Sequence, residues 1–175
     1  PPAGLAASAE VADGVFPIWL SPQQGGLIED HLAPGFARRS DGRTRADFDV
    51  APTVMVAVGD DVEACRRPVK EMLALYVGGM GARDRNFYNR YTRDMGYEAA
   101  AVAIQDLFLA GRREEAVQAV PDALVDEIAL VGPLARIRER AASWKRLGAE
   151  GRVGTLILGM RQPEHLGAIA EILLG

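Results

Sequence analysis

The chain has 175 residues, which is enough for one domain with a sizeable core. Its net charge is −4 and its pI is near 5.3, so nothing in the composition points to nucleic acid or to an anionic membrane as a partner. A single cysteine, Cys65, excludes an internal disulfide, and His31 and His165 lie far apart in the sequence with no cysteine beside them that would indicate a metal site. No apolar run approaches the roughly 20 residues that cross a bilayer, and no secretory signal is visible, so we expect a cytoplasmic protein.

The first third of the chain predicts a helix, a strand and a second helix. Apolar residues share one helical face over Leu5–Ala12, and Val15–Leu20 is an apolar run typical of a strand buried on both faces. Ser21-Pro22 then leads into a helix over Gln23–Ala33. The Arg-rich stretch Pro34–Asp49 is long for a loop, and we expect it to be either a functional lid or mobile.

The middle of the chain predicts a second strand and a long helix. Thr53–Val58 is the strand, and Asp61 can cap a helix that runs to about Val77. Pro68 lies inside this helix and predicts a kink or a delayed start. The glycines of Gly78-Gly79-Met80-Gly81 are expected to end it.

The remainder is helix-rich and closes on one more strand and helix. The third strand is predicted over Gly154–Leu158 and the last helix over Pro163–Leu174. Before them the pattern predicts helices over Phe87–Thr92, Tyr97–Ala110 and Arg113–Val120, a short one from Pro121-Asp122, and a long one from Gly132-Pro133 to about Leu147.

Three strand-to-helix units predict a parallel sheet and an α/β fold. Three strands do not close a barrel, and the chain opens on Pro1-Pro2 directly into helix-like sequence, so we expect the C-terminal portion of a larger α/β protein. The helices between about residues 82 and 130 are interpreted as an insertion. In a parallel barrel, the loops after the strands carry the chemistry, and here they begin at Leu20-Ser21-Pro22, Gly59-Asp60-Asp61 and Gly159-Met160-Arg161.

Several residues near these loops have both a structural and a functional interpretation. Ser21 could cap the next helix or help its N-terminus hold a phosphate, and Arg161 could be a surface residue or bind a phosphate or carboxylate. The arginines at 38–45 and 83–93 could be solvated loops or an anion-holding rim. The aromatic stretch at 87–91 could pack against helices or contact a ligand. No serine, cysteine or carboxylate set indicates a catalytic residue.

The chain resembles the C-terminal half of a bacterial luciferase-like monooxygenase, most closely the flavin- and deazaflavin-dependent oxidoreductase branch. The matching segments follow in order along nearly the whole chain: residues 9–18, 73–81, 86–89, 110–112, 120–126 and Gly132-Pro133. The resemblance implies an (α/β)₈ TIM barrel in which residues 1–175 form one domain with strands six to eight and a helical insertion at about 82–130. Pro1–Gly4 would be the tail of the loop after strand five.

The resemblance also implies a function and a set of cofactor contacts. Members of the family are usually dimers that bind a flavin or the deazaflavin coenzyme F420 at the mouth of the barrel. Carried over by position, the cofactor contacts are Gly4, Trp19, Leu20 and Ser21, and no metal is involved. The expected reaction is hydride transfer between reduced F420 and an organic substrate. The alternatives are an FMN-dependent monooxygenase using molecular oxygen, or a non-catalytic half-barrel that dimerises or sequesters a ligand.

Overall fold

The computed structural model describes residues 2–175, without the side chains of residues 25 and 27. The chain begins with helix α1 (Pro2–Val11), strand β1 (Gly14–Val15) and helix α2 (Gly25–Phe36). Strands β2 (Asp49–Val50) and β3 (Thr53–Val58) follow. The helices after β3 are α3 (Val62–Gly79), α4 (Phe87–Asp94), α5 (Glu98–Leu109), α6 (Arg113–Gln118) and α7 (Asp122–Ile128), and the chain ends with β4 (Ala129–Gly132), α8 (Leu134–Ala149), β5 (Ile157–Met160) and α9 (Leu166–Leu174).

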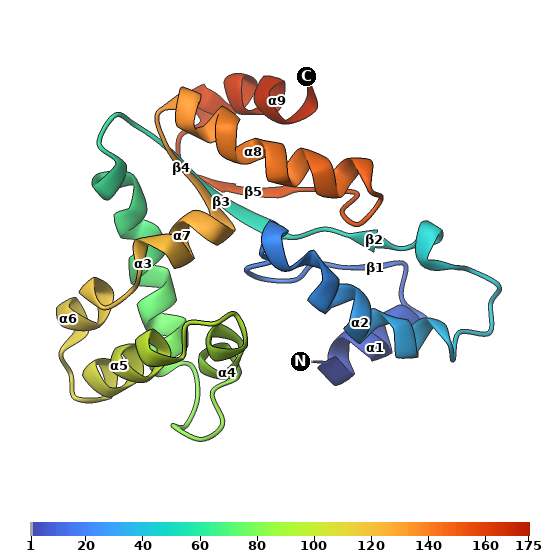
Figure 1. Cartoon of the computed structure of the whole chain (residues 1–175), viewed down its shortest axis with the longest axis horizontal. Helices are drawn as coiled ribbons and strands as arrows, with labels where there is room; N and C mark the ends of the chain where they lie inside the picture. Colours follow the sequence, from blue (N-terminus) through green and yellow to red (C-terminus); the bar gives the residue numbers. More distant parts are fainter. Residues whose placement is uncertain (1) are drawn as a thin grey trace.

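The described strands form a three-stranded and a two-stranded sheet, and all of their pairings are parallel, as the strand-to-helix rhythm predicts. β3 is central, with β4 on one edge and β5 on the other, and β1 pairs with β2 just before β3. An isolated bridge between Ile18 and Thr53 continues the β1 pairing toward β3. Figure 1 shows α3–α7 gathered as one lobe beside the sheet, whereas α8 and α9 lie over β5 and α1 and α2 lie near β1 and β2.

Two apolar cores cover the two faces of the sheet. Successive residues of a strand point to opposite faces, so Val54 and Val56 of β3 face one core, together with Val50 of β2, and Met55 and Ala57 face the other. The first core is completed by residues of α1, α2, α8 and α9, and the second by residues of α3–α7. Burial on both faces explains why the strands are continuous apolar runs.

Strand β4 was missed by the sequence prediction, which placed residues 129 and 130 in the inserted helices and began a helix at Gly132-Pro133. Ala129–Gly132 is a strand of four residues, all of them buried. A run this short carries no period that distinguishes a buried strand from the end of a helix. The inserted helices α4–α7 therefore end at Ile128, and α8 begins at Leu134.

Two strand predictions were wrong in their bounds. The predicted strand Val15–Leu20 is regular only at Gly14–Val15, with the single bridge at Ile18, because Pro17 has no N–H group to donate and Trp19 has a φ of 54°. The predicted strand Gly154–Leu158 begins later, at Ile157. Before that point the chain still follows the sheet, because the Gly154 N–H group donates to Val50 O at 3.2 Å.

The helix ends also differ from the sequence prediction. Helix α2 continues through Pro34 to Phe36, and at Gly35 a Cβ atom would lie 2.0 Å from the Ala6 carbonyl oxygen, so glycine permits the close packing of α1 on α2. Helix α3 begins at Val62 despite Pro68 and includes Gly78 and Gly79, which the sequence analysis assigned to the break. Pro2–Gly4 form the first turn of α1 and are not the tail of a loop, while Pro1 lies outside the described residues.

The arginines at 38–45 are paired with carboxylates and do not form an open rim for anions. Arg45 binds Glu29 through two bonds of 2.9 Å, and Arg39 binds Asp41 at 2.7 Å. The stretch 34–49 is also less irregular than predicted, because it contains the end of α2 and a 3₁₀ turn at Arg45–Asp47.

Candidate functional site

The candidate site lies where the first strand leaves the sheet and β4 begins. Thr53 and Gly59 donate their N–H groups to Pro17 O and Gly132 O, at 3.4 and 3.2 Å. Because these donors are an even number of residues apart on one extended segment, they point to the same edge. The first strand and β4 therefore follow one another along that edge, and residues 19–24 leave the sheet where β4 starts.

Trp19 is the most constrained residue at this point. It is 3% exposed, and it is the one non-glycine among the described residues with a positive φ, 54°. Its indole packs against Tyr76 and Tyr88, with ring centroids 5.6 and 5.2 Å away. Its carbonyl oxygen accepts a hydrogen bond of 3.1 Å from the Tyr91 hydroxyl. The indole N–H group is buried and has no partner among the described residues.

Glu127, near the end of α7, is the acceptor that organises the rest of the site. One of its oxygens accepts from the Ser21 hydroxyl and, at 3.2 Å, from the Gln24 amide. The other oxygen accepts from the Tyr97 hydroxyl at 2.8 Å. Burial, followed by the hydrogen bond to Glu127, raises the pKa of Tyr97 to about 12, so this hydroxyl keeps its proton at neutral pH.

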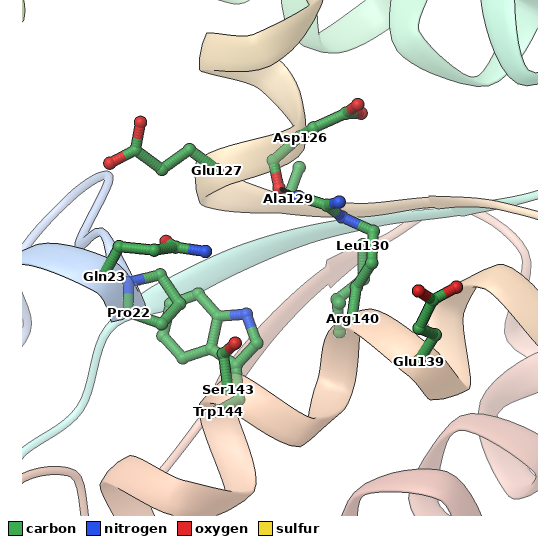
Figure 2. Close-up of a pocket in the computed structure, with 10 residues that line it drawn as sticks. All are labelled: Pro22, Gln23, Asp126, Glu127, Ala129, Leu130, Glu139, Arg140, Ser143 and Trp144. Atoms are coloured by element: carbon green, nitrogen blue, oxygen red, sulfur yellow. Dashed lines mark hydrogen bonds between the residues drawn. The ribbon is translucent and has the colours of Figure 1, made fainter.

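A cleft of about 170 Å³ opens beside this group, between the start of β4, α8 and the turn after Leu20. Figure 2 shows Asp126 and Glu127 pointing to different sides of the end of α7, with Arg140 and Trp144 rising from α8. Burial disfavours ionisation of Asp126, but the hydrogen bond from Arg66 and the charge of Arg136 outweigh it and hold the pKa of that carboxyl below its ordinary value. Asp126 is thus an ion-paired structural residue, whereas the described partners of Glu127 are neutral donors.

The residues carried over from the family resemblance are not all brought together. Trp19 and Leu20 are both buried, but their side chains enter different cores. Ser21 is 1% exposed, and among the described residues its hydroxyl bonds to the side chains of Glu127 and Gln23, not to the N–H groups that an N-cap would satisfy. Gly4 is exposed in α1, and Arg161 is exposed after β5, on the other edge of β3.

The sequence did not identify Glu127, Tyr97 and Gln24 as site residues. Glu127 follows the inward-facing Leu124 and Val125 of α7 and has no local mark of function. Its partner Ser21 lies 106 residues earlier in the chain, so only the folded structure joins them. Tyr91 belongs to the aromatic stretch that the sequence did single out, and the structure shows that stretch packing against Trp19.

Among the described residues, Trp19 suits contact with a planar redox cofactor better than Ser21 suits contact with a phosphate. The buried indole N–H group of Trp19 is a donor still without a partner, at the end of a parallel strand. Ser21 fits a phosphate less well, because its hydroxyl already donates to a carboxylate whose charge would repel the phosphate.

Residues 2–175 contain no group of three or more His, Cys, Asp or Glu side chains placed to hold a metal ion. None of the helices in that range is both long and apolar enough to span a bilayer.

Comparison with known proteins agrees with this architecture. A Mycobacterium tuberculosis (strain ATCC 25618 / H37Rv) protein named "putative coenzyme F420-dependent oxidoreductase" is 39% identical over 154 residues, which are 88% of this chain and 44% of that protein. The structure of the coenzyme F420-dependent tetrahydromethanopterin reductase from Methanopyrus kandleri superposes with a TM-score of 0.69 at 18% identity, covering 99% of this chain and 46% of that one.

This chain thus spans less than half the length of the relatives it matches, and the structural match confirms the fold as part of a TIM-type barrel. The model of the luciferase-like monooxygenase family matches residues 1–151. The chain therefore belongs to the luciferase-like monooxygenase family, as its ordered sequence motifs predicted.

Proposed function

We propose that the chain supplies the C-terminal strands of an F420-dependent oxidoreductase that transfers a hydride between reduced F420 and an organic substrate. The observation that carries the proposal is the 39% identity, over 88% of the chain, to a protein named for F420-dependent oxidoreduction. The similarity to the archaeal reductase, at 18% identity, supports the barrel fold alone.

When bound, F420 would supply the hydride, and the residues of this chain would bind and orient it. Trp19 offers a buried N–H donor that has no partner among the described residues, and Arg161 offers a positive charge for a phosphate or carboxylate group. Gly4, Leu20 and Ser21 are proposed as contacts by their position in the family pattern. The Tyr97 hydroxyl donates to Glu127, and this hydrogen bond helps to hold Glu127 beside Ser21.

Titration of the intact protein with F420 and with FMN, followed by cofactor fluorescence, tests the proposal. We expect F420 to bind at least about tenfold more tightly than FMN. If FMN binds more tightly, the proposed cofactor becomes FMN and the result favours a monooxygenase using molecular oxygen. Binding of neither cofactor would overturn the enzymatic proposal and favour a non-catalytic half-barrel.

The setting of the protein is proposed on the same family basis. We propose a cytoplasmic homodimer that acts on a small-molecule substrate, without nucleic acid or a membrane as a partner. Light scattering coupled to size-exclusion chromatography tests the dimer, since a monomer at micromolar concentration would contradict it.

A further inference from the structure

Trp19 has a backbone conformation that its own chemistry disfavours. A φ of 54° crowds Cβ against the backbone in every L-residue, and asparagine, aspartate and glycine are the residues that usually tolerate it. Trp19 follows an extended segment that would otherwise continue along β3. Because strained residues persist only where the surrounding structure over-determines them, contacts on Trp19 must stabilise this conformation.

Two hydrogen bonds flank the strained residue, and both come from the inserted helices. The Tyr91 hydroxyl of α4 donates to the Trp19 carbonyl oxygen at 3.1 Å, and Glu127 of α7 accepts from the Ser21 hydroxyl. The Trp19 carbonyl is thus bound by a residue 72 positions later in the chain, and the Ser21 hydroxyl by one 106 positions later. Between them the indole packs on Tyr88, which belongs to the same helix as Tyr91.

We propose that Tyr91 and Glu127 are positioning residues that hold the Trp19–Ser21 segment in the shape that binds the cofactor. The inference rests on the proposed function and extends it, because it gives the inserted helices a role at the binding site. Without the Tyr91 bond, the segment would relax toward extended backbone and the indole N–H group would change its direction. The burial of Tyr91, whose pKa is raised to about 12, keeps the hydroxyl protonated and able to donate.

Tyr91→Phe tests the first contact, with Tyr88→Phe as its matched control. Each variant keeps the ring and removes one hydroxyl, but among the described residues only the Tyr91 hydroxyl bonds to Trp19. We expect Tyr91→Phe to weaken F420 binding roughly five- to tenfold, which is the effect of losing one hydrogen bond, and Tyr88→Phe to change it less than about twofold. Equal effects of the two variants would overturn the assignment of Tyr91.

Glu127→Ala tests the second contact, with Glu139→Ala as its control. Both side chains line the cleft, and Glu139 is an exposed residue of α8. Glu127→Ala should weaken F420 binding by about tenfold or more, because the Ser21 and Tyr97 hydroxyls lose a common acceptor. Unchanged affinity in Glu127→Ala would remove Glu127 from the proposal.

A variant without backbone strain at residue 19 distinguishes a positioning role of Tyr91 from a general effect of Tyr91 on stability. Trp19→Gly permits a positive φ without steric strain, so Tyr91→Phe should change the amide exchange rates of Leu20 and Ser21 less than about twofold in that background. In the wild-type background the same substitution should raise those two rates about five- to tenfold while leaving α5 unchanged. Equal effects in both backgrounds would show that Tyr91 does not act through the strained residue. Amide exchange is measured without cofactor. Failure of the protein to bind F420 would therefore refute the proposed function, and the exchange rates would still decide the role of Tyr91 in shaping the segment.

Discussion

Substituting Gly78 by alanine should destabilise the protein, although alanine favours a helix. Gly78 lies in α3, and a Cβ atom there would lie 2.5 Å from Phe108 Cβ and 2.7 Å from Phe108 Cγ. Helix propensity favours alanine by up to about 1 kcal/mol. Overpacking a tight interior contact costs about 1–3 kcal/mol. We therefore expect a net loss of up to about 2 kcal/mol, which corresponds to a fall in Tm of roughly 4–8 °C for a domain of this size.

The position of the contact on Phe108 explains why a side-chain rotation cannot relieve the crowding in Gly78→Ala. The Cβ atom of Phe108 is attached to the backbone of α5, so the helix itself must move. At Gly79 the new methyl group would instead meet Phe108 Cε1 at 2.4 Å, on the ring, which can rotate. Gly79→Ala should therefore cost less than Gly78→Ala.

Urea unfolding measures both variants against Gly148→Ala in α8. There the new Cβ atom would have Val153 O as its described neighbour, at 3.8 Å, so the substitution should be neutral or stabilising by up to about 1 kcal/mol. If Gly78→Ala proves as stable as Gly148→Ala, the close packing of α3 on α5 is not a feature of the folded protein.

Three further predictions concern pH, a buried amide and a proposed contact. Burial raises the pKa values of Tyr91 and Tyr97 to about 12, above the value near 10 of an unfolded tyrosine, so their contribution to stability is complete below pH 10 and is lost as the pH rises toward 12. Urea unfolding at pH 8–11.5 should show this decline, and Tyr97→Phe should reduce it. Asn89→Ala should cost about 1–3 kcal/mol in the same assay, because the amide that donates to Val77 O and Ala101 O at 3.3 and 2.7 Å is lost. Arg161→Gln should change stability by less than about 0.5 kcal/mol, since the residue is exposed, yet weaken F420 binding in a fluorescence titration.

Each of these expectations has a contrary outcome. A stability that is constant up to pH 11.5 would mean that the two tyrosines are as hydrated in the folded chain as in the unfolded one. If Asn89→Ala is as stable as the wild type, water replaces the hydrogen bonds that the amide makes. Unchanged F420 affinity in Arg161→Gln would exclude that arginine as a phosphate contact.

The sequence by itself determined the helices and the family. Long helices repeat their apolar positions often enough to be identified locally, which is why α3, α5 and α8 were predicted within a few residues of their ends. The ordered motifs, each weak alone, predicted the luciferase-like family that the family comparison confirms. The parallel sheet followed from the alternation of strands and helices.

Tertiary structure alone decided β4, the left-handed turn at Trp19 and the hydrogen bonds on Glu127. A four-residue strand has too few residues for a period, and a strained φ is set by contacts that arrive from elsewhere. The Ser21–Glu127 pair joins residues 106 positions apart, and the two glycines read as a helix break are instead where Phe108 approaches α3. Local patterns record what a residue prefers, whereas these features depend on which distant residue the fold places beside it.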